Sequence, residues 1–138
     1  DENDVVIKSA AVADYKPKTY SDNKIKKKDG DLVIELDRNK DIAYEIGKIK
    51  NDKILVGFAA ETNDIIENAK AKIAKKNMDF IVANNLKESG AGFGTDTNIV
   101  SIIEKDGSMK EYPMMTKEEV ASVILDKIKT LLDNKSSL

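Results

Sequence analysis

The chain has 138 residues, about the size of one ordinary domain. Hydrophobic residues make up 41% of it and charged residues 35%, which is a globular composition. It contains no Cys and no His, so a disulfide framework, a Cys/His zinc site, a thiol nucleophile and a Ser-His-Asp triad are excluded. Any chemistry must therefore use Lys, Asp, Glu, Asn, Tyr and backbone groups, with or without a borrowed metal ion.

The charge and hydropathy of the chain narrow the partners that we expect. The formal net charge of -2 argues against a generally basic nucleic-acid binder. No apolar run reaches the length of a membrane span, and the first four residues lack the basic and apolar regions of a signal peptide. We therefore expect a soluble cytoplasmic domain that binds neither nucleic acid nor a membrane.

The first third of the chain is predicted to contain two strands and a helix, with a long loop between the strands. Val5–Ala13 is apolar, as in a buried strand, and residues 14–30 are polar and rich in lysine. Residues 32–37 alternate apolar and polar side chains, which predicts a half-exposed strand. A helix capped by Asn39 or Asp41 follows. The apolar face of this helix, which ends near residue 50, comprises Ile42, Ile46 and Ile49.

The middle of the chain is predicted to hold two buried strands with an amphipathic helix between them. Ile54–Ala60 and Phe80–Ala83 are short apolar runs typical of buried strands. Between them, Thr62 and Asn63 open a helix that ends near Asn77. The apolar stripe of this helix comprises Ile65, Ile66, Ala69 and Ile73.

The last third is predicted to contain a loop, a hairpin and a helix. Ser89–Gly94 matches neither glycine fingerprint for phosphate binding, so we interpret it as a turn. Ile99–Glu104 and Lys110–Tyr112 are predicted to pair as a hairpin, and Thr116 and Glu119 form a capping box for the final helix. The inward face of this helix comprises Val120, Val123, Ile124, Ile128 and Leu131, and the tail from Asn134 is expected to fray.

Together these elements predict an α/β fold. We expect a Rossmann-like, mostly parallel sheet flanked by helices, with an extended loop and strand segment and a C-terminal hairpin. The first apolar run begins almost at the first residue, whereas a buried strand normally has neighbours on both sides. We therefore expect residues 1–138 to be the C-terminal portion of a single domain whose N-terminal part is absent.

A ligand site is expected at one edge of the sheet. In open α/β sheets, ligands bind beyond the carboxyl ends of the strands. Residues 10–15, 59–62 and 83–85 are predicted to converge there, together with the helix start at residues 40–43, whose backbone N–H groups could bind an anion. The alternative is that the alanines pack under helices and that the helix start is simply capped.

Two groups of lysines are candidates for binding a polyanion. The denser group lies in the long loop and consists of Lys24, Lys26, Lys27 and Lys28. A polyphosphate would neutralise these charges. Lys70, Lys72, Lys75 and Lys76 form the second group, in which Lys72 and Lys76 share one helix face. The alternatives are a solvated loop and complementation of the helix dipole. Phe58 is either a core residue or a surface on which a base stacks. The residues alone thus predict an α/β domain with a lysine-rich site, for which a nucleotide is the candidate ligand.

Five motifs in the chain follow one another in a recognisable order. They are Ala10-Ala11-Val12-Ala13-Asp14-Tyr15, Lys24-x-Lys26-Lys27, Asn39-x-Asp41-Ile42, Gly57-Phe58-Ala59-Ala60-Glu61-Thr62 and Asp79-Phe80-Ile81-Val82-Ala83-Asn84. In this order the sequence resembles bacterial phosphopantothenate–cysteine ligase over nearly its whole length. In many bacteria that ligase is the C-terminal half of a bifunctional coenzyme A biosynthesis protein. The N-terminal half of that protein is an FMN-dependent decarboxylase, so the resemblance places FMN outside this chain.

The resemblance implies a reaction. It is the CTP-dependent ligation of 4'-phosphopantothenate and L-cysteine, in which CTP and Mg2+ convert the carboxylate to an acyl-cytidylate with release of diphosphate. The amine of cysteine then displaces CMP. Such chemistry needs cations where negative charge develops, and it needs no histidine.

The resemblance also implies roles for individual residues. Lys24 would be catalytic, stabilising charge in the nucleotidyl-transfer step, while Ala10 and Ala11 would border the substrate. No protein ligand of the metal is assigned. The nucleotide would contact Asp14, Lys24, Lys40, Asp41, Ile42, Ala43, Phe58, Lys72 and Lys76.

Partners and alternatives complete these expectations. The resemblance implies a homodimer, with residues 32–36 as the candidate intersubunit strand, and a fused or associated decarboxylase domain. The family's ligase domain begins with a glycine-rich region and an asparagine that this chain lacks, so we do not expect the chain alone to turn over. The alternative function is a non-catalytic nucleotide- or polyphosphate-binding module. A nicotinamide-dependent oxidoreductase is less favoured, because its glycine fingerprint is absent.

Overall fold

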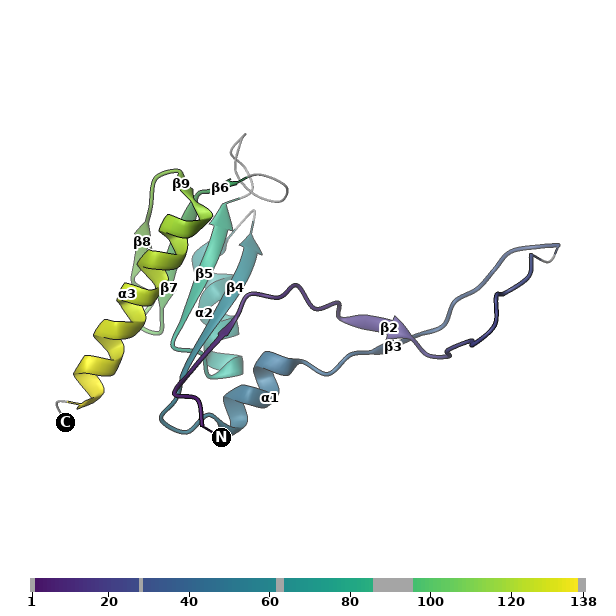
Figure 1. The fold of residues 1–138 in the computed structure, drawn as a ribbon, viewed down its shortest axis with the longest axis horizontal. Coiled ribbons are helices and arrows are strands. Elements are labelled where there is room, and N and C mark those ends of the chain that lie inside the picture. Colours follow the sequence, from purple (N-terminus) through teal and green to yellow (C-terminus); the bar gives the residue numbers. More distant parts are fainter. Residues whose placement is uncertain (1, 28, 62–63, 86–95, 137–138) are drawn as a thin grey trace.

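A five-stranded mixed sheet forms the centre of the molecule in a computed structural model, which describes residues 2–27, 29–61, 64–85 and 96–136 (Figure 1). The strands are β1 (Val5–Lys8), β4 (Ile54–Glu61), β5 (Phe80–Asn85), β7 (Val100–Glu104) and β8 (Met109–Glu111). Their order is β1-β4-β5-β7-β8, with parallel pairing from β1 to β5 and antiparallel pairing from β5 to β8. The predicted α/β fold and the hairpin are confirmed.

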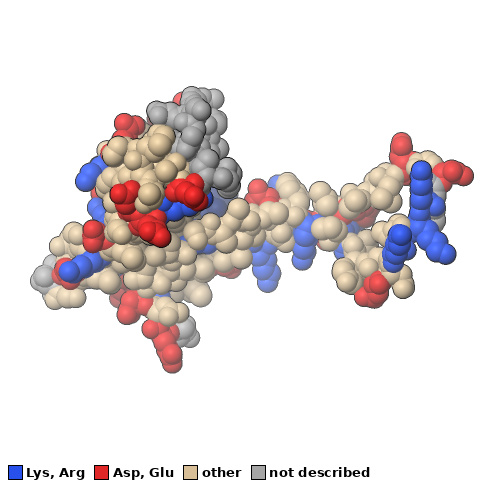
Figure 2. All heavy atoms as spheres, turned by 45° about the horizontal axis from the view of Figure 1, so that its top comes forward, with Lys and Arg blue, Asp and Glu red and all other residues tan. Residues whose placement is uncertain are grey.

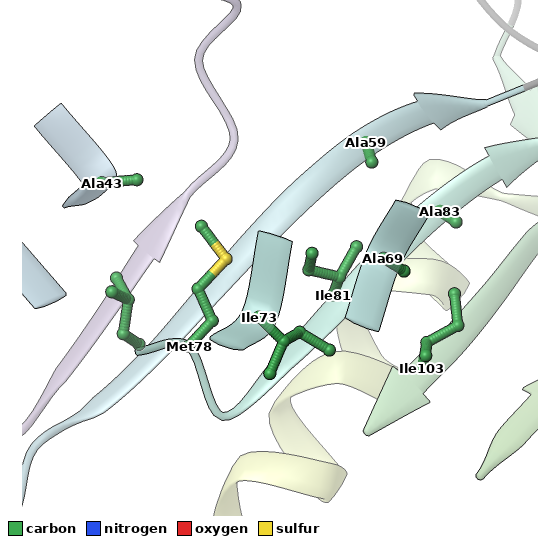
Figure 3. Close-up of a cluster of buried hydrophobic side chains, with 9 residues drawn as sticks. Ala43, Ala59, Ala69, Ile73, Met78, Ile81, Ala83 and Ile103 are labelled. Atoms are coloured by element: carbon green, nitrogen blue, oxygen red, sulfur yellow. The ribbon is translucent and has the colours of Figure 1, made fainter. Parts of the chain in front are cut away.

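Helices cover both faces of this sheet. They are α1 (Ile42–Ile49), α2 (Ile65–Lys76) and α3 (Lys117–Ser136). Because successive side chains of a strand point to opposite faces, Ile81 of β5 packs under α2 (Figure 3), whereas Phe80 and Val82 pack under α3. Each face thus buries its own apolar cluster, and the sheet is the shared wall between them.

Local chemistry fixes the helix ends. The Asp41 carboxylate accepts a hydrogen bond from the backbone N–H of Tyr44 at 3.1 Å and so caps α1. The capping box of α3 is confirmed: Thr116 N–H donates to Glu119 Oε2 at 2.8 Å, and Glu119 N–H donates to Thr116 Oγ1 at 3.2 Å. α3 continues to Ser136, so the expectation that the tail frays from Asn134 is wrong for the described part of that tail.

The buried face of α1 differs from the predicted one. Of the three predicted isoleucines, Ile46 packs against the buried cluster, whereas Ile49 is 71% exposed and Ile42 is 45% exposed. The fully buried residues of α1 are Ala43 and Gly47. Small residues face inward because α1 lies very close to the end of α2: a Cβ on Gly47 would lie 1.9 Å from the Lys76 carbonyl oxygen. The α2 stripe is closer to expectation, since Ala69 and Ile73 are buried, but Ile66 is 36% exposed. Thr62 and Asn63, predicted to open α2, lie outside the described residues, as does the loop predicted at Ser89–Gly94.

The described residues of the segment 15–38, which are 15–27 and 29–38, leave the sheet as an extended arm (Figure 1). Its inner part is a two-stranded ladder of β2 (Tyr15–Pro17) and β3 (Leu36–Arg38), paired in antiparallel fashion. The strand predicted over residues 32–37 is therefore reduced to the end of that segment, because a strand forms only where a partner lies opposite. The strand predicted over Val5–Ala13 likewise ends at Lys8, where its pairing with β4 stops and the chain turns toward the arm.

A second small sheet lies beside the start of α3. It consists of β6 (Thr97–Asn98) and β9 (Met115–Thr116), which pair in antiparallel fashion. This pairing positions the start of α3 beside β6.

Candidate functional site

A cleft of about 570 Å³ lies where the arm joins the helices. Its lining residues are Asp14, Tyr15, Arg38, Asn39, Asp41, Tyr44 and Lys75. Tyr15 and Arg38 come from the inner end of the arm, and Asp14 directly precedes it. The others come from α1, from the residues before it and from α2. The cleft thus lies beyond the carboxyl end of parallel strand β1, the position that open α/β sheets offer to ligands.

Hydrogen bonds at Asn39 hold the arm end of the cleft together. The side-chain Nδ2 of Asn39 donates to the Ala13 carbonyl oxygen at 2.8 Å, and its backbone N–H donates to the Asp14 carbonyl oxygen, also at 2.8 Å. The Arg38 guanidinium lies over the ring of Tyr15, 5.9 Å from its centroid. The segments entering and leaving the arm are therefore joined at the rim of the cleft.

Asp41 is a carboxylate of the cleft whose pKa is lowered by its surroundings. Burial by itself would raise the pKa of this carboxyl group, but a hydrogen bond from Lys76, another from the backbone of Tyr44 and the charge of Lys8 together lower the pKa below its ordinary value. Asp41 Oδ2 lies 3.0 Å from Lys76 Nζ. The Asp41 side chain is thus ionised at neutral pH and engaged with α2.

The structure brings together part of the predicted site. Asp14 and Asp41 line the same cleft, and Lys76 contacts Asp41. Lys40 is exposed beside Asp41, whereas Ala43 is buried under the sheet face. Ala43 could meet a ligand only through its backbone.

Other predicted residues lie apart from the cleft. Lys24 belongs to the outer part of the arm, and Figure 2 shows basic side chains gathered at the outer end. Phe58 packs against the cluster under α3, on the face opposite α1. Ala10 and Ala11 are exposed between β1 and β2, and Lys72 is half-buried on α2.

Five lining residues were not among the predicted site residues: Tyr15, Arg38, Asn39, Tyr44 and Lys75. One signal was present, because Arg38 is the single arginine of the sequence and is adjacent to a predicted motif. Lys75 belonged to a lysine-rich stretch, but the sequence could not tell which of its lysines faces the arm.

An α/β domain with a charged cleft beyond a parallel strand is a ligand-binding class of fold. Comparison with known proteins narrows this class. Residues 1–132 match the family described as DNA/pantothenate metabolism flavoprotein C-terminal domain. The chain belongs to this family.

Two curated relatives give the scale of the similarity. The coenzyme A biosynthesis bifunctional protein CoaBC of Bacillus subtilis (strain 168) is 55% identical over 131 residues, which are 95% of this chain and 32% of that protein. A protein named cysteine/cysteine sulfinic acid decarboxylase, from an unknown prokaryotic organism, is 50% identical over 132 residues, which are 95% of this chain and 37% of that protein. The chain thus spans about a third of the length of these relatives.

Solved structures share the fold. The C-terminal domain of a coenzyme A biosynthesis bifunctional protein CoaBC superposes with a TM-score of 0.73 at 46% identity, covering 95% of this chain and 58% of that one. The DNA/pantothenate metabolism flavoprotein from Streptococcus pneumoniae superposes with a TM-score of 0.74 at 25% identity, covering 94% of this chain and 64% of that one.

These comparisons correct the identification made from the sequence. The family is described as part of a flavoprotein, and the relative whose name specifies a reaction is a decarboxylase, so we withdraw the assignment to phosphopantothenate–cysteine ligase. The CTP-dependent ligation and the alternative of a nucleotide- or polyphosphate-binding module are withdrawn with it. CTP and Mg2+ are withdrawn as the expected cofactors on the same ground. The expectation that FMN lies outside this chain was also wrong, because a flavoprotein description implies a flavin. The motifs led to coenzyme A biosynthesis, which the name of the Bacillus subtilis relative contains, and to a reaction that neither relative's name supports.

The relatives agree with one of the expected partners and do not support the others. Bifunctional relatives agree with a fused partner domain, whereas the three predicted substrates and the homodimer inferred from the ligase family have no support in these names. None of the helices in the described residues combines the length and hydropathy needed to cross a bilayer.

Proposed function

We propose that this chain is the C-terminal part of a cytoplasmic bifunctional enzyme of coenzyme A biosynthesis, and that it serves the decarboxylation of a cysteine-derived carboxylate. The observation that carries the proposal is the 55% identity over 95% of the chain with the Bacillus subtilis bifunctional protein. The name of the 50% identical decarboxylase supplies the reaction.

The cleft offers this reaction a binding site for an anion. Arg38 and Lys75 present a guanidinium and an ammonium group, and such cations form the stronger, charge-assisted hydrogen bonds with phosphate or carboxylate oxygens. A cation that held the departing carboxylate in the ground state would oppose its loss as CO2. Arg38 and Lys75 therefore suit a remote phosphate of the substrate or cofactor, whose binding energy can orient the reacting end.

FMN is the cofactor that the family description implies. Whether the cleft fits it can be asked separately for the phosphate and for the isoalloxazine ring. Its phosphate suits Arg38 and Lys75. Its isoalloxazine ring would meet Tyr15 and Tyr44, but their side chains are 50% and 36% exposed and the rest of the described lining is polar or charged. Flavin-sized rings are ordinarily enclosed by apolar walls. The described residues therefore fit the phosphate and do not by themselves fit the ring, so we derive no chemical step through the flavin.

The roles predicted from the sequence for individual residues remain proposals, and these residues lie at different distances from the cleft. Asp14 and Asp41 would shape its floor, and Lys76 would keep Asp41 ionised. Lys24 stays a predicted catalytic residue, although it belongs to the outer arm. Ligand contacts proposed outside the lining of the cleft are those of Ala10, Ala11, Lys40, Ile42, Ala43, Phe58 and Lys72.

The test uses a chimera in which this chain replaces the aligned third of the Bacillus subtilis protein. We expect the chimera to support coenzyme A formation in cells depleted of their own protein, and to release CO2 from a cysteine-derived carboxylate in vitro. Arg38→Ala should lower kcat/KM for CO2 release by about tenfold or more, the loss typical of one charge-assisted hydrogen bond. The matched control, Lys129→Ala on the exposed side of α3, should leave it unchanged.

Two outcomes would contradict the proposal. A folded chimera that fails to support coenzyme A formation would refute its place in the pathway. A chimera whose Arg38→Ala variant loses coenzyme A formation while CO2 release is unchanged would assign this chain to another step of the bifunctional protein. FMN fluorescence, titrated separately against the chain itself, reports whether these residues bind the flavin.

A further inference from the structure

The tripeptide Lys-Asp-Gly occurs twice in the chain, at residues 28–30 and at residues 105–107. An aspartate followed by glycine is prone to cyclise, because glycine has no side chain to hinder attack of its backbone nitrogen on the carboxyl carbon of the aspartate. The reacting groups are the same at both positions. Any large difference in reactivity between them therefore comes from their surroundings in the fold.

The reaction needs no cofactor, oxidant or reductant. The backbone nitrogen of the glycine forms a bond to Cγ of the aspartate, and the amide proton leaves with the carboxyl hydroxyl group as water. The product is a five-membered succinimide ring. Water then opens this ring at either carbonyl: one opening restores aspartate, and the other leaves the backbone running through Cγ, which is isoaspartate. Both reacting groups have to be free of other partners for the ring to form.

The turn between β7 and β8 holds both reacting groups of its Asp-Gly pair. Asp106 Oδ1 accepts a hydrogen bond from the Ser108 backbone N–H at 2.8 Å. The Gly107 N–H, which would be the nucleophile, donates to the Glu104 carbonyl oxygen at 3.0 Å. The side chain of Lys70 packs against this glycine, since a Cβ built on Gly107 would collide with Lys70 Cε. Cyclisation here has to break two hydrogen bonds in a crowded turn.

The same turn also weakens the electrophile. The side-chain and backbone hydrogen bonds from Ser108 lower the pKa of the Asp106 carboxyl group below its ordinary value. The group is therefore protonated less often, and the protonated carboxyl group is the form that can lose its hydroxyl as water.

The Asp-Gly pair of the arm, which Figure 1 shows extending away from the sheet, is open. Asp29 and Gly30 are both exposed, and neither makes a hydrogen bond or an ion pair with another residue of the described part of the chain. A Cβ built on Gly30 would find nothing within 4 Å, and its φ of +102° is one that glycine adopts freely. Local rotation alone brings this carboxyl group to the glycine nitrogen.

We propose that Asp29–Gly30 is the site at which this chain converts aspartate to isoaspartate, and that the fold protects Asp106–Gly107 from the same reaction. The product keeps a carboxylate and adds one carbon to the backbone of the arm. Neither Asp29 nor Gly30 belongs to a buried cluster. The modification therefore changes the arm and leaves the packing of the sheet and its helices intact.

Incubation of the folded chain in heavy-oxygen water at neutral pH measures the reaction, because each ring opening places one heavy oxygen in the product. The chain is then digested in ordinary water with trypsin, which releases residues 29–38 and 106–110 as separate peptides. Mass spectrometry with electron-transfer fragmentation locates the label and distinguishes isoaspartate from aspartate. We expect label to accumulate at Asp29 faster than at Asp106 by about tenfold or more, the factor that corresponds to one charge-assisted hydrogen bond.

Two controls separate the fold from the local sequence. Asp29→Glu keeps the charge but would have to form a six-membered ring, so label at this position should fall to background. In the chain unfolded by guanidinium chloride, the two peptides should gain label at similar rates, because the surroundings no longer differ.

Several results would overturn the proposal: no label at Asp29, equal or faster labelling of Asp106 in the folded chain, or a tenfold difference that persists in guanidinium chloride. Label that remains in Asp29→Glu would do the same. The measurement needs neither substrate nor flavin, so a failure of the proposed decarboxylase function leaves its result intact.

Discussion

Replacing Asp79 by Asn should destabilise the fold far more than its position near the surface suggests. Asp79 Oδ2 accepts hydrogen bonds from Lys50 Nζ at 2.6 Å and from the Leu55 backbone N–H at 2.7 Å, and Lys105 Nζ lies 3.6 Å from Oδ1. The Lys50 side chain is only 5% exposed, so Asp79→Asn leaves a buried ammonium group whose other hydrogen bond goes to the Lys53 carbonyl oxygen. Removing one partner of a buried ion pair typically costs about 3–5 kcal/mol.

Urea denaturation followed by far-UV circular dichroism measures this cost. At constant m-value, we expect the free energy of unfolding to fall by about 3–5 kcal/mol for Asp79→Asn. The exposed pair is the control: Glu35→Gln, which breaks the Lys18–Glu35 contact between side chains that are 54% and 70% exposed, should cost less than about 1 kcal/mol. The double variant Lys50→Met/Asp79→Leu should recover part of the loss, because no unpaired charge remains, although the buried Leu55 N–H loses its acceptor. A cost below about 1 kcal/mol for Asp79→Asn, or no recovery in the double variant, would refute the reasoning.

Three further predictions concern stability. Gly47→Ala should cost about 1–3 kcal/mol in urea denaturation, because its Cβ would lie 1.9 Å from the Lys76 carbonyl oxygen; a neutral result would mean that α1 and α2 separate freely. Phe80→Ala, at a fully buried position of β5, should cost about 3–5 kcal/mol in the same assay, and a cost near zero would contradict the packed cluster under α3. Burial alone would raise the pKa of Asp79, but the hydrogen bonds from Lys50 and from the Leu55 backbone, with the nearby charges, lower it below its ordinary value. The stability that this group adds is therefore fully present above the unfolded-state pKa of about 3.9 and lost as the pH falls through the lower folded-state value. Unfolding free energies measured from pH 6 to pH 2 should fall more steeply in the parent chain than in Asp79→Asn, and parallel curves would contradict the assignment.

The sequence predicted the central strands well for a physical reason. Residues 54–57 and Phe80–Ala83 are buried on both faces, and such strands are continuous apolar runs that few other structures accommodate. The capping box of α3 is equally local, since Thr116 and Glu119 bond to each other's backbone whatever the rest of the fold does. In both cases the information lies within a few neighbouring residues.

The site was predicted less completely, because its residues meet only through the fold. The motif around Asp41 pointed to the right helix start, and Ile46 packs inward as predicted. That Ala43 and Gly47 are the fully buried residues of α1 depends on how close α2 approaches, which the apolar periodicity does not encode. Similarly, Phe58 and Asp41 lie on opposite faces of the sheet although their motifs suggested one pocket.

The sequence by itself determined three features: the absence of cysteine and histidine, the alternation of strands with helices, and the order of the motifs. Composition and local pattern do not depend on which distant residues become neighbours in the fold. The tertiary structure alone decided that the lysine-rich segment belongs to an arm, that Asn39 joins that arm to residues 13 and 14, and that Arg38 and Lys75 share a cleft. These contacts join residues more than 20 positions apart. Their geometry comes from the crossing of chain segments and from the packing of α1 against α2, which no local pattern specifies.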